Sequence, residues 1–343
     1  MNQKKMYKVG SLFAGVGGIC QGFKNAGYSI SWANELDTKA CETYRLNHNK
    51  TNLVVGDINN VDISSLKKID ILTAGFPCQP FSLAGKKRGF EDDRGKVFYR
   101  VIDFLKQLKP KAFLLENVKN LATHDDGNSF KKVKESIINS GYSFIPFILK
   151  SNEICDIPQA RERLYIVGFR NESSFFYDFP VKENTLKLKK SFSEEFTIPK
   201  KNVDSNVKHF KEFLDPGSIH VSDYYDDFDN HIHKKVANAI DCVDSVYQYR
   251  RHYVRKNKSK VCPTLTANMG SGGHNVPIIH DNKGPRKLNP RECFNLQGFP
   301  FDFKFPNIAR GHLYKQAGNS VVVPVVKEIA KNRKTPSILT ILR

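Results

Sequence analysis

A single cysteine, Cys78, stands between Pro77 and Pro80, shortly after a run of apolar residues from Ile69 to Ala74. Such a run, ending at Gly75, is typical of a buried strand. Proline fixes its own φ angle and restricts the residue before it, so the thiol is expected on a stiff turn. Ligands of open α/β sheets bind at the carboxyl ends of the strands. The position therefore favours a nucleophilic cysteine, with an inert buried thiol as the alternative.

Two further groups that could take part in catalysis are associated with later strands. Glu116 ends the apolar run that begins at Lys111, and a carboxyl group at this edge of a sheet is placed to act as an acid. Arg161 and Arg163 alternate along an extended segment, so both side chains are expected on one face. Paired guanidinium groups suit a phosphate or a base carbonyl, whereas an ion pair with a neighbouring carboxylate such as Glu162 is the structural alternative.

A glycine-rich loop, Ala14 to Gly18, lies between a predicted strand at 9–13 and a predicted helix at 19–26. Backbone N–H groups at the start of a helix form a site for an anion. The last glycine of the G-x-G-x-x-G pattern is absent because Cys20 occupies its position, which weakens a dinucleotide interpretation.

Acidic residues follow the next two predicted strands. Glu35 comes about 20 residues after the glycine loop, where a carboxylate can accept hydrogen bonds from ribose hydroxyls. Asp57 could accept a hydrogen bond from an exocyclic amine while Ile58 packs on the ring. Each carboxylate alone would more often be a helix cap or a turn residue. The glycine loop, Glu35 and Asp57 follow three successive predicted strands, and together they favour a cofactor that contains a nucleoside.

The elements that position these residues alternate along the first half of the chain. Predicted strands at 28–33, 52–55, 111–115, 144–149 and 164–169 alternate with predicted helices at 97–108 and 129–140, which indicates an open α/β sheet. From about residue 180 the sequence becomes lysine-rich and weakly periodic. Residues 247–256 then alternate aromatic and basic side chains as one predicted strand, and 262–273 is rich in glycine and hydroxyls. This region is predicted to be a loop-rich recognition module.

Composition restricts the possible partners. The 343 residues carry a formal charge of +19, which favours a polyanion, most often nucleic acid; a merely solvated basic surface is the alternative. The seven cysteines never form C-x-x-C, which argues against a disulfide framework and a structural zinc site and indicates a reducing compartment. No apolar run is long enough for a membrane span or a signal peptide, so we expect a cytoplasmic protein without a metal.

Taken together and in this order, the segments resemble the 5-methylcytosine DNA methyltransferases of bacterial restriction-modification systems. The resemblance covers residues 9–180 and 286–330. The matching segments are Phe13-Ala14-Gly15-x-Gly17-Gly18, Asn34-Glu35-x-Asp37, Gly56-Asp57-Ile58, Gly75-Phe76-Pro77-Cys78-Gln79-x-x-Ser82, Glu116-Asn117-Val118, Gln159-x-Arg161-x-Arg163, Arg291-Glu292 through Pro300, and Gly318-Asn319-Ser320-Val321.

The resemblance implies methyl transfer from S-adenosyl-L-methionine to carbon 5 of a cytosine that has been flipped out of duplex DNA. Cys78 would add to carbon 6 as a thiolate, and Glu116 would protonate or hydrogen-bond ring nitrogen N3. Arg163 would contact the flipped base and Arg161 would support the site.

The same resemblance implies two sets of binding residues. The expected cofactor contacts are Phe13, Ala14, Gly15, Gly17, Gly18, Glu35, Asp57, Ile58, Pro77, Phe299, Asn319 and Ser320. The expected DNA contacts are Gln79, Ser82, Arg88, Arg250, Arg251, Tyr253, Arg255, Thr264 and Thr266.

The implied architecture is a Rossmann-like methyltransferase sheet with helices on both faces, plus a smaller target-recognition domain. The expected catalytic domain is 1–180, completed by 312–343; the recognition domain is 181–285 and a hinge is 286–311. The expected partner is double-stranded DNA with a short specific site, bound by a monomer, with a cognate restriction endonuclease as a possible separate partner. A transfer-RNA methyltransferase of the same family is the main alternative; a non-catalytic DNA-binding protein and an oxidoreductase are less favoured.

Overall fold

The computed structural model describes residues 6–77, 93–170, 198–199, 207–215, 217, 219–227, 229–250, 252–257, 260–271 and 275–331. The chain forms two compact units: 1–149, 162–201 and 325–343 make the first, and 150–161 and 202–324 the second. These units divide the chain differently from the expected domains, since 150–161 and 312–324, expected in the catalytic domain, belong to the second unit together with the expected hinge 286–311. Gln159 gives one physical reason, because its side-chain amide donates to the carbonyl oxygen of Leu296 and to Oε1 of Gln297.

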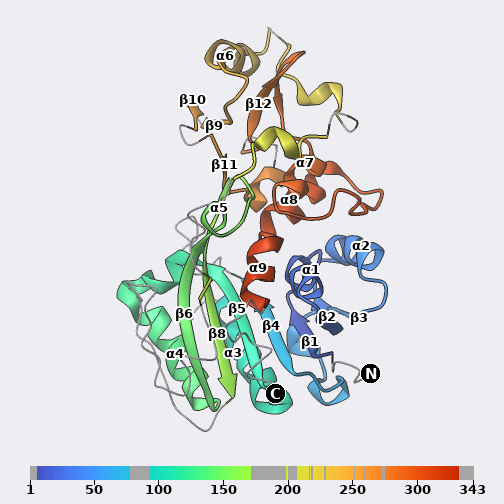
Figure 1. Cartoon of the computed structure of the whole chain (residues 1–343), viewed down its shortest axis with the longest axis vertical. Helices are drawn as coiled ribbons and strands as arrows, with labels where there is room; N and C mark the ends of the chain where they lie inside the picture. The colour runs from blue at the N-terminus through green and yellow to red at the C-terminus, as the bar shows by residue number, and fades with distance from the viewer. Residues whose placement is uncertain are drawn as a thin grey trace. The chain divides into compact units, whose positions relative to one another are not determined.

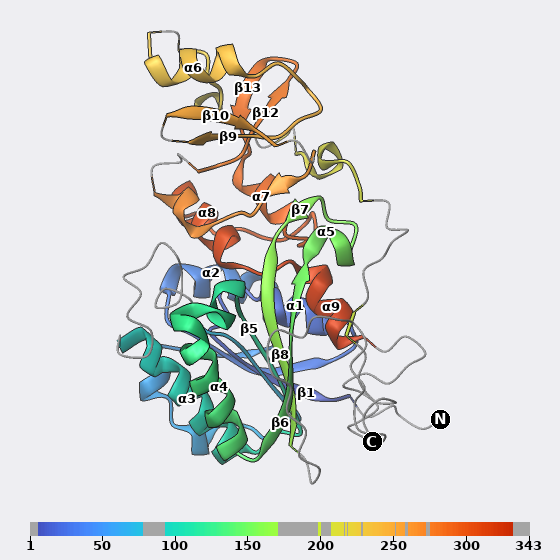
Figure 2. The ribbon, with the colours of Figure 1, turned by 90° about the vertical axis from the view of Figure 1, so that its left-hand side faces the viewer.

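The first unit is built on a seven-stranded sheet of order β3-β2-β1-β4-β5-β8-β6, visible in Figures 1 and 2. The strands are β1 (Lys8–Leu12), β2 (Ser29–Glu35), β3 (Asn52–Val55), β4 (Ile71–Gly75), β5 (Ala112–Val118), β6 (Tyr142–Lys150) and β8 (Glu162–Arg170). Strands β1 to β5 pair in parallel, whereas β8 runs antiparallel to β5. The carboxyl ends of five parallel strands therefore meet at one edge.

Helices cover both faces of this sheet, which confirms the predicted fold class (Figure 2). Helices α3 and α4 lie on one face, and α1 and α9 on the other. The helices of the first unit are α1 (Gly18–Asn25), α2 (Thr38–Asn47), α3 (Asp93–Leu108), α4 (Asn128–Asn139) and most of α9 (Val323–Ala330).

The core between the sheet and α3 and α4 follows from the apolar spacing of these elements. In α4, Phe130, Val133 and Ile137 recur at helical spacing and are all buried. They join one apolar cluster with Phe104 of α3 and Phe113 of β5. Burial of this cluster fixes the sheet whose edge carries the candidate catalytic groups.

The second unit contains a four-stranded sheet of order β10-β9-β12-β13 and several short helices. Its elements are α5 (Ser151–Ile154), β7 (Gln159–Ala160), α6 (His231–Ala239), β9 (Tyr247–Arg250), β10 (Tyr253–Lys256), β11 (Cys262–Pro263), β12 (Ile278–Asp281), β13 (Gly284–Lys287), α7 (Pro290–Asn295) and α8 (Arg310–Asn319). The expectation of one strand at 247–256 is wrong, because β9 and β10 are two antiparallel strands in which Arg250 pairs with Tyr253. The pattern misled because aromatic and basic residues alternate within both strands.

Candidate active site

The described segment after β4 ends at Pro77, the residue before the predicted nucleophile Cys78. At the end of β4, Gly75 pairs with Glu116 of β5. The amide of Asn117 donates to the carbonyl oxygen of Phe76 at 3.2 Å, which ties the segment after β4 to β5. Asn117 was not among the predicted site residues, although it stands next to Glu116 in a matching segment. Cys78, Gln79, Ser82 and Arg88 lie outside the described residues.

Glu116 and Arg163 form an ion pair at this edge. Nε of Arg163 lies 3.2 Å from Oε1 of Glu116, and the two side chains are only 15% and 12% exposed. The pair arises because β8 runs antiparallel to β5, with Arg163 opposite Val118, two residues beyond Glu116. A terminal nitrogen of Arg163 also donates to the Glu162 carbonyl oxygen at 2.7 Å. The structure thus brings together the two side chains that the sequence assigned to the target base.

Arg161 has a different set of partners. Its guanidinium donates to the carbonyl oxygens of Leu265 at 2.7 Å and Gly318 at 3.1 Å, and the residue is 4% exposed. Thus Arg161 holds backbone segments within the second unit, while Arg163 belongs to the first. Such a position agrees with a supporting role and leaves Arg163 as the arginine beside Glu116.

The glycine loop adopts three left-handed backbone conformations in alternation. Phe13, Gly15 and Gly17 have φ angles of 52°, 56° and 91°. Three N–H groups of this segment already have acceptors, because Ala14 donates to the Asn34 carbonyl oxygen, Gly15 to Glu35 and Gly17 to the Ala14 carbonyl oxygen. Gly17 is the N-cap of α1 and Gly18 its first residue. Because no side chain caps this helix, the N–H groups of its first turn are directed at the loop region.

Glu35 fixes the loop and keeps part of its hydrogen-bonding capacity. One carboxylate oxygen accepts from the N–H of Gly15 at 2.7 Å, and the other accepts from the N–H groups of Leu36 and Asp37. A carboxylate has about four acceptor directions, so the oxygen facing Gly15 retains one for a ligand hydroxyl. The neighbouring Ala14 is also tied to this strand, since its N–H donates to the Asn34 carbonyl oxygen.

The third strand end carries Asp57 and Ile58. Asp57 caps a short 3-10 helix at 58–60 by accepting the N–H of Asn59 at 2.8 Å, and Ile58 is buried. Asp57 is therefore the turn residue that the sequence offered as an alternative, and this bond engages only one of its two oxygens. The amide of Asn34 joins the second and third strand ends by donating to the carbonyl oxygens of Val54 and Gly56.

The remaining predicted cofactor residues are Pro77, at the end of the described segment after β4, and three residues of the second unit. Phe299 is buried against the rings of Phe294 and Phe303, with centroids 5.1 and 4.6 Å away. Asn319 ends α8 and is exposed, and the buried Ser320 is its C-cap. Because Arg161 holds the carbonyl oxygen of Gly318, the turn carrying Asn319 has a fixed backbone.

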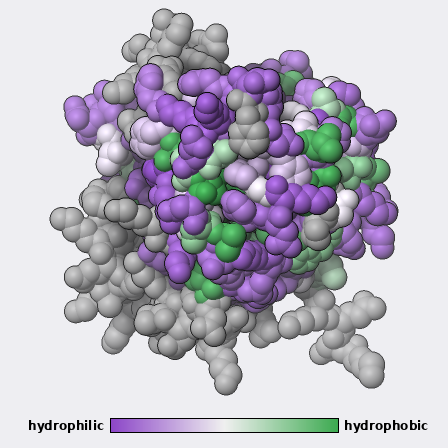
Figure 3. All heavy atoms as spheres, turned by 90° about the horizontal axis from the view of Figure 1, so that it is seen from above, coloured by the Kyte–Doolittle hydropathy of each residue, from purple (hydrophilic) through white to green (hydrophobic). Residues whose placement is uncertain are grey.

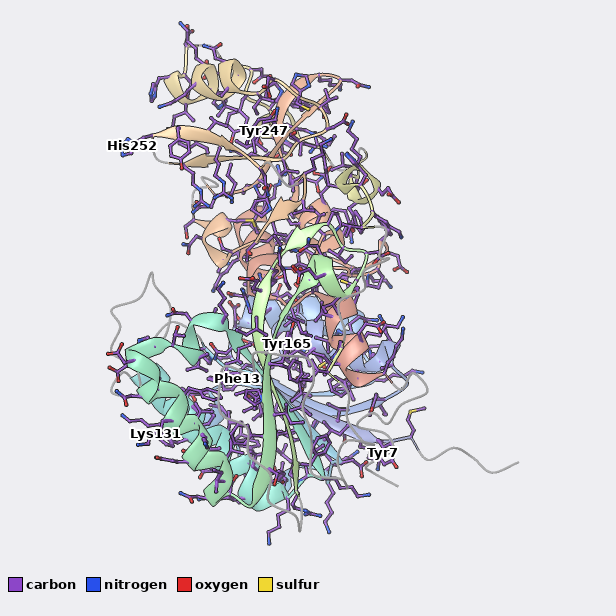
Figure 4. All side chains as sticks on the ribbon, turned by 60° about the vertical axis from the view of Figure 1, so that its left-hand side comes forward. Tyr7, Phe13, Lys131, Tyr165, Tyr247 and His252 are labelled. Atoms are coloured by element: carbon purple, nitrogen blue, oxygen red, sulfur yellow. The ribbon has the colours of Figure 1, made fainter. Side chains whose placement is uncertain are left out.

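The hairpin of β9 and β10 gathers three predicted DNA contacts on one face. Directly opposed residues and residues two apart share a face of a sheet, so Arg250, Tyr253 and Arg255 lie together. Arg250 and Arg255 are exposed, and Tyr253 is 57% exposed. The opposite face, with Tyr247 and Val254, packs into the core of this unit. Figure 4 shows His252 at the outer end of the hairpin and Tyr247 inside it.

Of the other predicted DNA contacts, Arg251 lies outside the described residues, and the two threonines flank the buried Leu265. The hydroxyl of Thr264 donates to the carbonyl oxygen of Ala160 at 2.7 Å. Thr266 is exposed and precedes a 3-10 helix at 267–270.

The molecular face in Figure 3 is mostly hydrophilic, with smaller hydrophobic areas between the polar side chains.

Other cysteines are poor competitors for the nucleophilic role. Burial raises the pKa of Cys20, Cys41, Cys262 and Cys293, that of Cys41 to about 11. These thiols therefore stay protonated near neutral pH and react slowly. Cys242 differs from these thiols, because hydrogen bonding by Ser245 lowers its pKa. It belongs to the second unit, whereas Glu116 and Arg163 belong to the first.

The described part of the chain contains neither a metal-binding cluster nor a membrane-spanning helix. It holds no cluster of three or more His, Cys, Asp or Glu side chains that could bind a metal ion. Among the same residues, every helix is too short or too polar to cross a membrane.

Comparison with known proteins gives a consistent result. The family model described as C-5 cytosine-specific DNA methylase matches residues 7–335. The chain is 44% identical over 331 residues to the Type II methyltransferase M.Bsp6I of Bacillus sp. (strain RFL6), covering 95% of this chain and 98% of that protein. It is 35% identical over 329 residues to M.HhaI of Haemophilus parahaemolyticus, covering 94% and 92%.

Solved structures match the same fold. The S. pombe Dnmt2 methyltransferase superposes with a TM-score of 0.66 at 22% identity, covering 94% of this chain and 96% of that one. The Entamoeba histolytica methyltransferase EhMeth gives a TM-score of 0.69 at 19% identity, covering 95% and 97%.

Proposed function

Because the chain belongs to the family of C-5 cytosine-specific DNA methylases, we propose that Glu116 and Arg163, with Cys78, bind and activate its target cytosine. The enzyme methylates carbon 5 of cytosine in DNA in a sequence-specific manner. Relatives described as Type II methyltransferases favour DNA over transfer RNA as the substrate. The ion pair between Glu116 and Arg163 is the observation that carries the assignment of the site.

Carbon 5 of cytosine is a weak nucleophile, so the enzyme must first raise its electron density. In our proposal the Cys78 thiolate adds to carbon 6 while Glu116 donates a proton or hydrogen bond to N3, which makes carbon 5 enamine-like. Arg163 holds the Glu116 carboxyl group at the sheet edge and offers its remaining N–H groups to the base. After methylation a base removes the proton from carbon 5, the sulfur leaves carbon 6 as the Cys78 thiolate, and N3 returns to Glu116 any proton that it received. Because these atoms are inaccessible in a stacked duplex, the cytosine must flip out.

We assign S-adenosyl-L-methionine as the methyl donor, and the residues of the first unit fit it. When bound, it supplies an electrophilic methyl group. The uncapped start of α1, at Gly17 and Gly18, suits its carboxylate, and the spare acceptor direction of Glu35 suits a ribose hydroxyl. Asp57 and the buried Ile58 suit an adenine amine and ring face. Phe13, Ala14, Gly15, Pro77, Phe299, Asn319 and Ser320 complete the proposed set.

The second unit is proposed to read the DNA. Arg250, Tyr253 and Arg255 share one exposed hairpin face, and guanidinium groups pair with phosphates or with guanine edges. We also propose DNA contacts for Thr266, which is exposed, and for Arg251. We propose a monomer that acts on cytoplasmic DNA with a short specific site, alongside a separate cognate endonuclease.

The test is transfer of a labelled methyl group from S-adenosyl-L-methionine to either duplex DNA or transfer RNA. We expect label in DNA, at one cytosine of a short recurring sequence that bisulfite sequencing identifies. Cys78→Ser is expected to abolish the label, because the replacement hydroxyl is a much weaker nucleophile than a thiolate. Label in RNA alone would reject the DNA substrate, and an active Cys78→Ser enzyme would reject the nucleophile.

A further inference from the structure

The buried His48 lies against Gly17 of the glycine loop and contacts the half-buried Lys24, and neither side chain has a part in the site described above. Nζ of Lys24 in α1 lies 2.8 Å from Nδ1 of His48, the C-cap residue of α2. His48 is 1% exposed, and its ring packs on that of Tyr44 with centroids 4.4 Å apart. The pair therefore connects the helix that begins at the loop with the helix that follows β2.

The imidazole of His48 also determines the space available to the loop. A Cβ atom at Gly17 would lie 2.1 Å from Nε2 of His48, a distance that packed atoms do not reach. The Val16 backbone also faces this ring. Since Gly17 has a φ of 91° as well, both the ring and the backbone conformation require glycine here. The imidazole is thus the surface on which the left-handed turn at Gly17 rests.

The contact with Lys24 determines which nitrogen of His48 carries the proton. An ammonium group has only donors, so Nδ1 must accept and Nε2 must be protonated. Burial, followed by the charge of Lys24, lowers the pKa of His48 to about 3, so the ring is neutral near pH 7. Nε2–H therefore lies against Gly17, the N-cap residue of α1, and has no hydrogen-bond partner among the described residues.

We propose that Lys24 and His48 are positioning residues for the carboxylate end of the methyl donor. They hold Val16 and Gly17 so that the N–H groups at the start of α1 remain directed at that carboxylate. This inference rests on the proposed use of S-adenosyl-L-methionine. Preorganised donors bind an anion without a cost of reordering, so loss of the pair weakens binding of a carboxylate selectively.

The experiment compares two ligands by isothermal titration calorimetry of the full-length protein. S-adenosylhomocysteine carries the amino-acid carboxylate, and 5′-methylthioadenosine lacks it. The variants are His48→Phe, which keeps an aromatic ring, and Lys24→Met, which keeps an unbranched stem. We expect each variant to bind S-adenosylhomocysteine about 10-fold more weakly, and 5′-methylthioadenosine with less than about a 2-fold change.

Two comparisons make the result specific. The double variant is expected to be no weaker than either single one, because the two residues act as a unit. Thr43→Val, at a buried position of α2 whose hydroxyl donates within the helix, is the matched control and should bind both ligands normally.

Equal loss of both ligands, or unchanged affinity for S-adenosylhomocysteine, would overturn the inference. Thermal unfolding of each variant identifies a general loss of stability, which would weaken both ligands together. A wild-type protein that binds neither ligand would reject the proposed methyl donor itself, and the positioning role with it.

Discussion

Glu116 and Arg163 orient each other across two neighbouring strands, and a bond to the Glu162 carbonyl oxygen on its own strand also holds Arg163. Because Nε of Arg163 contacts Oε1 of Glu116, the direction of the carboxyl group is fixed relative to the guanidinium. Fixed direction matters for proton donation to a ring nitrogen, since a catalytic acid must lie within hydrogen-bond reach of its target. At the scale of the residue, the site is therefore a pair whose members depend on each other.

Replacing Glu116 by Gln tests the acid role at this scale. Glutamine keeps the size and one acceptor of the side chain but has no acidic proton, so turnover should fall ~10²–10⁴-fold while DNA affinity stays nearly unchanged. Single-turnover methylation and DNA-binding titrations measure the two quantities separately. Glu162→Gln is the matched control, because Glu162 pairs with the exposed Lys119 and should retain activity. A parallel loss of DNA binding in Glu116→Gln would assign Glu116 a structural role.

At the scale of the element, buried apolar runs made the parallel strands predictable. The strand expected at 52–55 is β3, and the strand expected from 69 to 74 overlaps β4. Strand neighbours were not predictable, because periodicity reveals a strand but not its partner: β8 lies between β5 and β6. The break between β9 and β10 was missed because the sequence between the two strands contains no glycine, proline, asparagine or aspartate.

The same limit applies to the arginines of the candidate site. Alternation placed Arg161 and Arg163 on one face, but each guanidinium finds its own partners. The partners of Arg161 lie more than one hundred residues away in the sequence, at Leu265 and Gly318. Local spacing cannot reveal such carbonyl contacts, because they depend on the packing of the second unit.

The second unit also contains a buried ion pair whose removal has a predictable cost. Two guanidinium nitrogens of Arg286 donate to the carboxylate of Glu292 at 2.8 Å each, and both side chains are almost fully buried. Glu292→Ala leaves the buried Arg286 with Asp281 as its remaining carboxylate among the described residues and removes the acceptor of the Asn289 N–H, so the free energy of unfolding should fall by about 3–5 kcal/mol. Urea denaturation measures this change. The control Glu328→Ala removes a more exposed pair with Lys331 and should cost less than about 1 kcal/mol; equal losses would contradict the prediction.

At the scale of the whole molecule, the formal charge of +19 should appear as a steep salt dependence of DNA affinity. Each phosphate that a basic side chain neutralises releases counterions, so log affinity should fall linearly with log salt, with a slope of about −0.9 per phosphate contacted. Arg255→Ala should make this slope less steep by about one unit, because Arg255 is exposed on the hairpin face proposed to contact DNA. Lys131→Ala, an exposed lysine of α4 labelled in Figure 4, is the matched control and should leave the slope unchanged. Fluorescence anisotropy over 50–200 mM salt provides the slopes. A flat response in the wild type would mean that the excess charge serves another purpose, and equal effects of both variants would remove the special role of the hairpin.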